Sequence, residues 1–202
     1  MALRNTFTPI KHKTMKTRIF TLVALFLVAT ISTALAQSKK IDIAASTITW
    51  TGYKVTGQHE GTISLKEGSL TFEDNKLVGG AFTMDMNSIN TTDLSGQGKE
   101  KLDGHLKSDD FFGVAKFPTA NLTFKKVVET DDNVYRVAAD LTIKGNKSRV
   151  AFDIELESDT AETSLKIDRT KFGIKYGSAT FMDGLKDRAI NDEFDLAVNL
   201  KF

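Results

Sequence analysis

The 202-residue sequence contains no cysteine. This absence excludes disulfide bonds, catalytic thiols, thiolate metal sites and lipid attachment through an N-terminal cysteine. A folded domain must then derive its stability from an apolar core, and a chain of this length is long enough to bury one.

Histidine is scarce as well, since only His59 and His105 follow residue 36. Neither stands in a metal-ligand spacing such as H-E-x-x-H. A G-x-S-x-G nucleophile elbow and a complete glycine-rich phosphate loop are also missing. We therefore predict no enzyme, no metal site and no cofactor. An enzyme that uses His59 or His105 stays open as a hypothesis, but no reaction can be named for it.

The sequence has no apolar run long enough to span a membrane comfortably. Its longest, residues 19–31, follows four basic residues within 11–18 and precedes the A-x-A site at 34–36. This order is typical of a secretory signal peptide, which we place at residues 1–36, with Met15 as an alternative start. Cleavage before Gln37 predicts a soluble domain of residues 37–202, either periplasmic or secreted.

An excess of charge is also absent once the leader is removed. The leader holds five of the 27 basic residues and none of the 26 acidic ones, so residues 37–202 carry a net charge of −4. Because the lysines are scattered, we predict no nucleic-acid partner, no anionic membrane footprint and no stable membrane insertion.

The residues that are present alternate between apolar and polar from Ile41 onward. At the C-terminus, for example, Phe194, Leu196 and Leu200 share one parity. Eight or nine such segments predict strands with one buried face. Turn residues between them predict short hairpins, at 67–68, 74–75, 131–133, 145–146 and 158–159. We predict an all-β fold, an eight-stranded antiparallel meander barrel, whose interior is either filled or holds one ligand.

Two segments, 90–115 and 175–190, lack the alternation and are longer than hairpins need. For the first we predict a short helical segment around residues 98–113. Ser108 is expected to cap a second helical turn, with Asp109 and Asp110 at its start. That turn would place Phe111 and Phe112 over the barrel as a cover.

Several stretches resemble the YceI-like family, in order and over nearly the whole of residues 37–202. They are 48–70, 105–124, 141–156, 167–174 and the C-terminal strand, and the most specific is the block from His105 to Pro118. The resemblance implies an exported lipocalin-like barrel whose apolar interior binds a long-chain isoprenoid or a related lipid.

The leading hypothesis is therefore a carrier that sequesters or transports an isoprenoid or fatty-acid-type lipid. The alternative is a barrel with a filled core that acts through its surface as an interaction or stress-response protein. The identity of the lipid and a homodimer that shares one long chain stay open. The candidate ligand-binding residues are the apolar Trp50, Phe82, Met84, Phe111, Phe112, Phe124, Phe172 and Phe181 and the polar Lys54, His59, His105 and Arg169.

Overall fold

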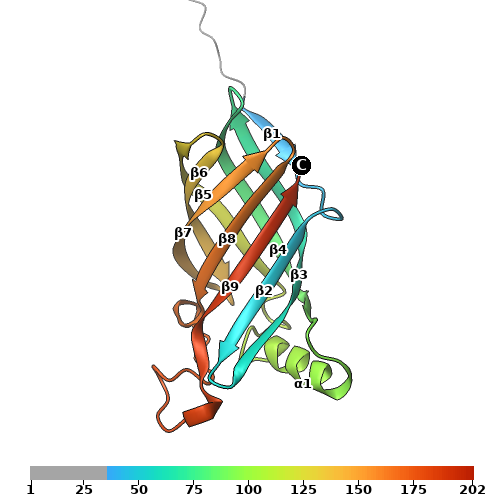
Figure 1. Cartoon of the computed structure of the whole chain (residues 1–202), viewed down its shortest axis with the longest axis vertical. Helices are drawn as coiled ribbons and strands as arrows, with labels where there is room; N and C mark the ends of the chain where they lie inside the picture. The colour runs from blue at the N-terminus through green and yellow to red at the C-terminus, as the bar shows by residue number, and fades with distance from the viewer. Residues whose placement is uncertain (1–35) are drawn as a thin grey trace, which may run out of the picture. The chain divides into compact units, whose positions relative to one another are not determined.

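The structure, a computed structural model, describes residues 36–202. The predicted leader lies outside the described residues except for Ala36. The elements in chain order are β1 (Gln37–Lys40), β2 (Thr47–Lys54), β3 (Gly57–Glu73), β4 (Lys76–Thr91), α1 (Gly96–Lys107), β5 (Thr119–Asp131), β6 (Val134–Ile143), β7 (Asn146–Glu157), β8 (Thr160–Asp168), the 3-10 turns η1 (Arg169–Phe172) and η2 (Lys186–Arg188), and β9 (Ile190–Lys201) (Figure 1).

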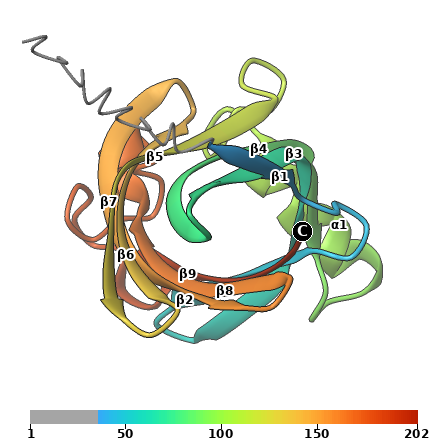
Figure 2. The same cartoon turned by 90° about the horizontal axis from the view of Figure 1, so that it is seen from above.

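The strands form one antiparallel sheet that closes on itself. Its order is β1-β3-β2-β9-β8-β7-β6-β5-β4, and β3 also pairs with β4, so β2 to β9 form a closed ring (Figure 2). The predicted eight-stranded barrel is confirmed. The short β1 pairs with residues 69–72 of β3, beyond the stretch 57–62 that pairs with β2.

The expected hairpins are mostly present. Asp74, Asn75, Asn133 and Ser158 adopt positive φ angles at the turns, as residues with short polar side chains tolerate. The hairpin predicted at 145–146 lies one residue earlier, at Lys144 and Gly145.

The turn predicted at Glu67-Gly68 is wrong, because β3 continues through it as one strand of 17 residues. Its register against β4 shifts between Leu65 and Glu67, which absorbs the irregularity. A Cβ on Gly68 would lie 2.8 Å from the Phe82 ring. The glycine therefore permits a close approach inside the barrel and does not mark a turn.

The helical segment is also shorter than predicted, since α1 ends at Lys107. Ser108 is its C-terminal cap, and the Ser108 hydroxyl donates to the His105 carbonyl at 2.8 Å. Asp109 pairs instead with Lys116 at 2.6 Å. The expected second helical turn is a series of tight turns, in which the Gly113 N–H donates to the Ser108 carbonyl.

The two ends of the barrel differ. The C-terminus, β1 and four short connections lie at one end, whereas α1 and the long connection from β8 to β9 lie at the other, which we call the α1 end (Figure 1). At the C-terminal end the Phe72 and Phe202 rings pack 5.7 Å apart. Among the described residues, no helix has the length and apolar character needed to cross a membrane.

Candidate functional site

The interior of the barrel contains a cavity of about 350 Å³. This volume falls in the range of small-molecule pockets. Its wall is built from the inward parity of the strands, because successive side chains of a strand point to opposite faces. The aliphatic part of the wall includes Ile48, Ile63, Leu65, Met86, Ile89, Leu122, Leu141, Ile143, Ile154, Leu165, Leu196, Val198 and Leu200.

The cavity opens at the α1 end. Three residues of its wall are exposed to solvent, Lys54, Asn191 and Glu193. Lys54 ends β2 and pairs in register with Ile190 at the start of β9. Asn191 and Glu193 follow Ile190 on β9. The mouth therefore lies next to the end of β2 and the start of β9, and the apolar wall lies deeper.

Ten of the twelve candidate ligand-binding residues line this cavity. Phe82 and Phe124 lie side by side in the deep wall, with ring centroids 5.7 Å apart. Trp50 lies opposite Gly61 of β3, and its indole N–H donates to the Thr62 carbonyl at 3.3 Å. Met84 lies on β4 between strands β3 and β5. Whether these side chains bind a ligand stays a prediction.

The Phe111-Phe112 pair belongs to the cover that follows α1. Phe111 is buried, and the two rings meet edge to face at 5.1 Å. Phe112 reaches Phe194 of β9, with centroids 6.5 Å apart. The segment therefore closes against the barrel wall even without the second helical turn.

His105 lies in the wall between two aromatic rings. Its imidazole centroid is 5.6 Å from that of Phe111 and 4.5 Å from that of Tyr176. Its Nε2 atom is one of two buried side-chain polar atoms of the described residues that have no hydrogen-bond partner within the protein; the other is Ser178 Oγ. A polar group of a bound molecule can therefore satisfy Nε2 without displacing a protein contact.

His59 also lines the cavity, but it has a protein partner. Its Nδ1 lies 2.8 Å from Asp93 Oδ2, and the Glu60 N–H donates to the other carboxylate oxygen. Burial alone would raise the pKa of Asp93, but the hydrogen bonds from His59 and Glu60 outweigh it and lower the pKa. Asp93 was not among the predicted site residues, and no spacing in the sequence indicates this pairing.

Arg169 reaches the cavity wall, yet most of its donors bond to the protein. Its guanidinium donates to the carbonyls of Asn191, Ile174 and Ile190 at 2.9–3.0 Å, and it lies 5.5 Å from the Phe111 ring centroid. Burial lowers the pKa of Arg169, while Asp192 and Asp168 oppose that change. Arg169 thus ties the β8–β9 connection to the mouth.

The remaining two candidates, Phe172 and Phe181, lie outside the cavity wall. Phe172 is buried on η1, where its carbonyl accepts from the Asn146 side chain at 2.9 Å. Phe181 is exposed on the β8–β9 connection, and Lys175 Nζ lies 4.4 Å from its ring centroid. Both were predicted to line a pocket because large apolar residues are concentrated in and beside the irregular segments, but the path of that connection directs them elsewhere.

The sequence prediction missed most of the aliphatic wall and the polar Asn191 and Glu193. Most of the aliphatic residues carry a clear signal, since they share the inward parity of their strand; Ile89 is an exception, because its parity is opposite to that of Met84 and Met86 on the same strand. Within residues 36–202, no three His, Cys, Asp or Glu side chains gather closely enough to hold a metal ion.

Comparison with protein families matches residues 40–202 to the YceI-like domain. A curated UPF0312 protein of Staphylococcus aureus strain USA300 is 32% identical over 109 residues, which cover 48% of this chain and 57% of that protein. The chain therefore spans little more than half the length of this relative.

Solved structures share the fold. Burkholderia cenocepacia BcnA has a TM-score of 0.64 at 21% identity, covering 79% of this chain and 98% of that one. A polyisoprenoid-binding domain from Saccharophagus degradans has a TM-score of 0.57 at 17% identity, covering 80% and 97%. A Campylobacter jejuni YceI protein has a TM-score of 0.51 at 18% identity, covering 98% of this chain and 92% of that one. At these identities the likeness establishes the barrel fold.

Proposed function

Since the chain belongs to the YceI-like family, we propose that it binds a long-chain isoprenoid or fatty-acid-type lipid inside its barrel and sequesters or transports it. The observation that carries the proposal is the cavity of about 350 Å³ with its apolar wall. The structural neighbour described as a polyisoprenoid-binding domain supports the ligand class.

Burial of the hydrocarbon chain supplies the driving force. Each methylene that leaves water for the cavity contributes about 0.8 kcal/mol, from which the loss of ligand freedom must be subtracted. Chain length should therefore dominate affinity. The polar groups near the mouth, Lys54, Asn191 and Glu193, favour an orientation with the chain inside and the head group outward. His105 Nε2 is the group that we expect to bond a head-group oxygen near the cover.

We further propose that the protein acts after export, in the periplasm or outside the cell. The signal-like pattern at residues 1–36 supports this location. The first strand begins at Gln37, directly after the proposed cleavage position. Sequencing the N-terminus of the purified protein tests the cleavage position, because a chain that retains the apolar run would contradict it.

Binding is favoured over the alternative of a filled barrel. That alternative requires an interior without a cavity of ligand size, whereas the cavity of about 350 Å³ supports binding. Catalysis through the histidines gains no support either, because among the described residues neither imidazole is hydrogen-bonded to a hydroxyl that it could activate: His59 is paired with Asp93, and His105 Nε2 has no partner within the protein.

The proposal is tested by extracting natively purified protein with organic solvent and analysing the extract by mass spectrometry. We expect a long-chain lipid in roughly stoichiometric amount. Leu196→Trp, which fills the cavity from β9, should lose the lipid, whereas Ala197→Trp on the outer face of the same strand should retain it. Protein that is purified without lipid and also takes up no prenyl or acyl probe would contradict the proposal.

A further inference from the structure

Large apolar side chains are exposed beside the cavity mouth. Tyr176, Phe181 and Met182, on the connection from β8 to β9, are 47%, 49% and 46% exposed. They are the aromatic and methionine side chains among the exposed large hydrophobic residues of the described chain; the others are valine and isoleucine. Exposure of such side chains on one loop is typical of a surface that contacts an apolar partner.

Hydrogen bonds fix this loop at the mouth. The Ile190 N–H donates to the Gly177 carbonyl at 2.8 Å, and the Val55 N–H donates to the Ala189 carbonyl at 3.3 Å. Tyr176 packs on His105 of the cavity wall. Val55, at the tip of the hairpin between β2 and β3, is itself exposed. We call Val55, Tyr176, Phe181 and Met182 the rim.

The charges of the molecule are distributed unequally between its two ends. The four connections at the C-terminal end, 41–46, 74–75, 132–133 and 158–159, hold four aspartates and no basic residue, a net charge of −4. The connections at the α1 end, 55–56, 92–118, 144–145 and 169–189, hold ten basic and seven acidic residues, a net charge of +3. The net charge of the domain conceals this asymmetry, so the sequence prediction of no anionic membrane footprint did not take it into account.

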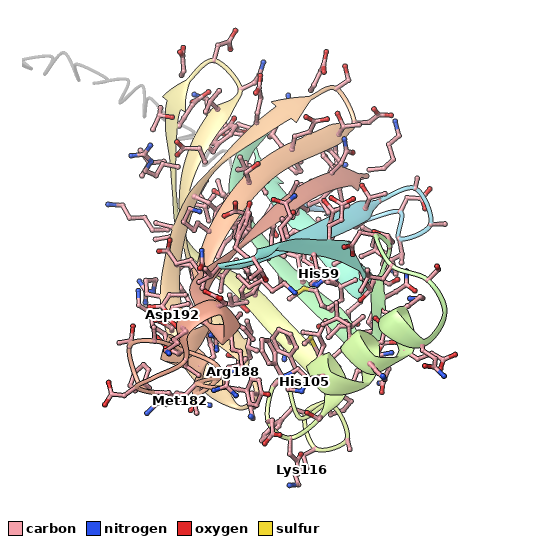
Figure 3. The ribbon with its side chains drawn as sticks, turned by 60° about the horizontal axis from the view of Figure 1, so that its bottom comes forward. His59, His105, Lys116, Met182, Arg188 and Asp192 are labelled. Atoms are coloured by element: carbon pink, nitrogen blue, oxygen red, sulfur yellow. The ribbon has the colours of Figure 1, made fainter. Side chains whose placement is uncertain are left out.

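Basic residues lie next to the apolar ones at the α1 end. Figure 3 shows Met182, Arg188 and Lys116 at the same end of the barrel as His105. Lys175 lies over the Phe181 ring, so its methylenes and that ring form one amphipathic surface. A surface that combines exposed apolar groups with cations fits the boundary between the head groups and the acyl chains of an anionic membrane.

We infer that the rim docks reversibly on a bilayer surface that contains anionic phospholipid, so that the cavity mouth faces the membrane from which the lipid comes. The role of this docking in lipid uptake rests on the proposed function, but vesicle binding itself can be tested independently of it. The opposite end carries net negative charge, so an anionic surface repels it and orients the barrel.

The test measures co-sedimentation of the purified protein with vesicles. One set is phosphatidylcholine alone and the other contains phosphatidylglycerol as well. We expect binding to the second set that weakens as salt is raised. The double variant Val55→Ser and Met182→Ser, neither of which lines the cavity, should lower the partition coefficient about tenfold. Lys186→Glu with Arg188→Glu should lower it about a hundredfold.

The matched control is Val78→Ser with Val128→Ser, two exposed residues near the C-terminal end, at 42% and 44%. This control should bind vesicles as the parent does. The inference is overturned if the parent binds neither vesicle, if the rim variants bind as well as the parent, or if the control loses as much binding. A protein partner, not a membrane, would then be the occupant to seek.

Ligand analysis keeps the inference separate from the proposed function. Rim variants should still take up a detergent-dispersed prenyl probe, but should take up little from vesicles. If the protein contains lipid but does not bind vesicles, only the docking inference is overturned. If the protein binds vesicles through the rim but never contains a lipid, only the proposed function is overturned.

Discussion

Gly61 illustrates how one residue positions a wall of the cavity. It lies opposite Trp50 across the β2–β3 pair, and a Cβ at this position would lie 2.2 Å from the Asn90 carbonyl oxygen and 2.5 Å from the Trp50 ring. We expect Gly61→Ala to cost about 3 kcal/mol, because the indole or the β4 backbone must move. Thermal unfolding followed by circular dichroism measures the loss, at about 2–4 °C per kcal/mol.

Gly104 provides the matched control for the same chemical change. It lies inside α1, and a Cβ there meets nothing within 4 Å. Gly104→Ala should therefore stabilise the protein by about 0.5–1 kcal/mol through helix propensity. Equal changes in stability at the two positions would show that the packing around Trp50 tolerates a methyl group, which would contradict the short distances at Gly61. The chain has a single tryptophan, so its fluorescence reports any shift of that ring.

Parity decides the direction of a strand side chain, although not whether that side chain binds a ligand. Trp50 and Lys54 share one parity of β2, and both line the cavity. The same rule placed Arg169 inward, but it carries no information about partners. The carbonyls that accept from Arg169 come from residues five and about twenty positions away. Only the folded path of the β8–β9 connection brings them together.

At the scale of elements, α1 is attached to β4 by a partly buried polar cluster. Lys99 Nζ contacts Asn90 Oδ1, the Thr91 carbonyl and Asp103 Oδ2 at 2.6–2.8 Å. Asp103 also accepts from the Thr91 N–H and hydroxyl. Burial alone would raise the pKa of Asp103, but these hydrogen bonds outweigh it and lower the pKa. The helix therefore docks through hydrogen bonds as well as through Leu106.

We expect Asp103→Asn to destabilise the protein by about 1–2 kcal/mol at neutral pH. The folded-state pKa lies below the unfolded one, so this contribution is complete above about pH 4 and is lost as the pH falls further. The difference in stability between variant and parent should shrink in that acid range. Hydrogen exchange of residues 96–107 should quicken in the variant. Asp110→Asn, at an exposed position, is the control. A difference that does not depend on pH would contradict the assignment to this carboxylate.

Alternation and turn residues predicted most strands, because a strand with one buried and one solvent-exposed face must alternate apolar and polar residues. They failed where a glycine serves packing, as at Gly68, and where a bulge reverses the parity. The parity of Phe82 and Met84 would direct Val78 inward, but it is exposed, and Leu77 is buried in its place. The shift in register opposite Thr71 and Phe72 causes this reversal. Bulges depend on the partner strand, which the local pattern does not contain.

At the scale of the whole molecule, the barrel surrounds its cavity, so a lipid held there contacts only the folded state. Binding to the folded state alone raises stability by about 2.7 kcal/mol when free ligand is a hundredfold above Kd. We expect reloaded protein to melt about 5–10 °C above solvent-extracted protein. Leu196→Trp, with its cavity filled, should show little of this shift, while Ala197→Trp should show all of it. Identical melting of extracted and reloaded parent protein would mean that the lipid binds elsewhere or not at all, because a ligand inside a closed ring of eight strands must be released when the ring opens.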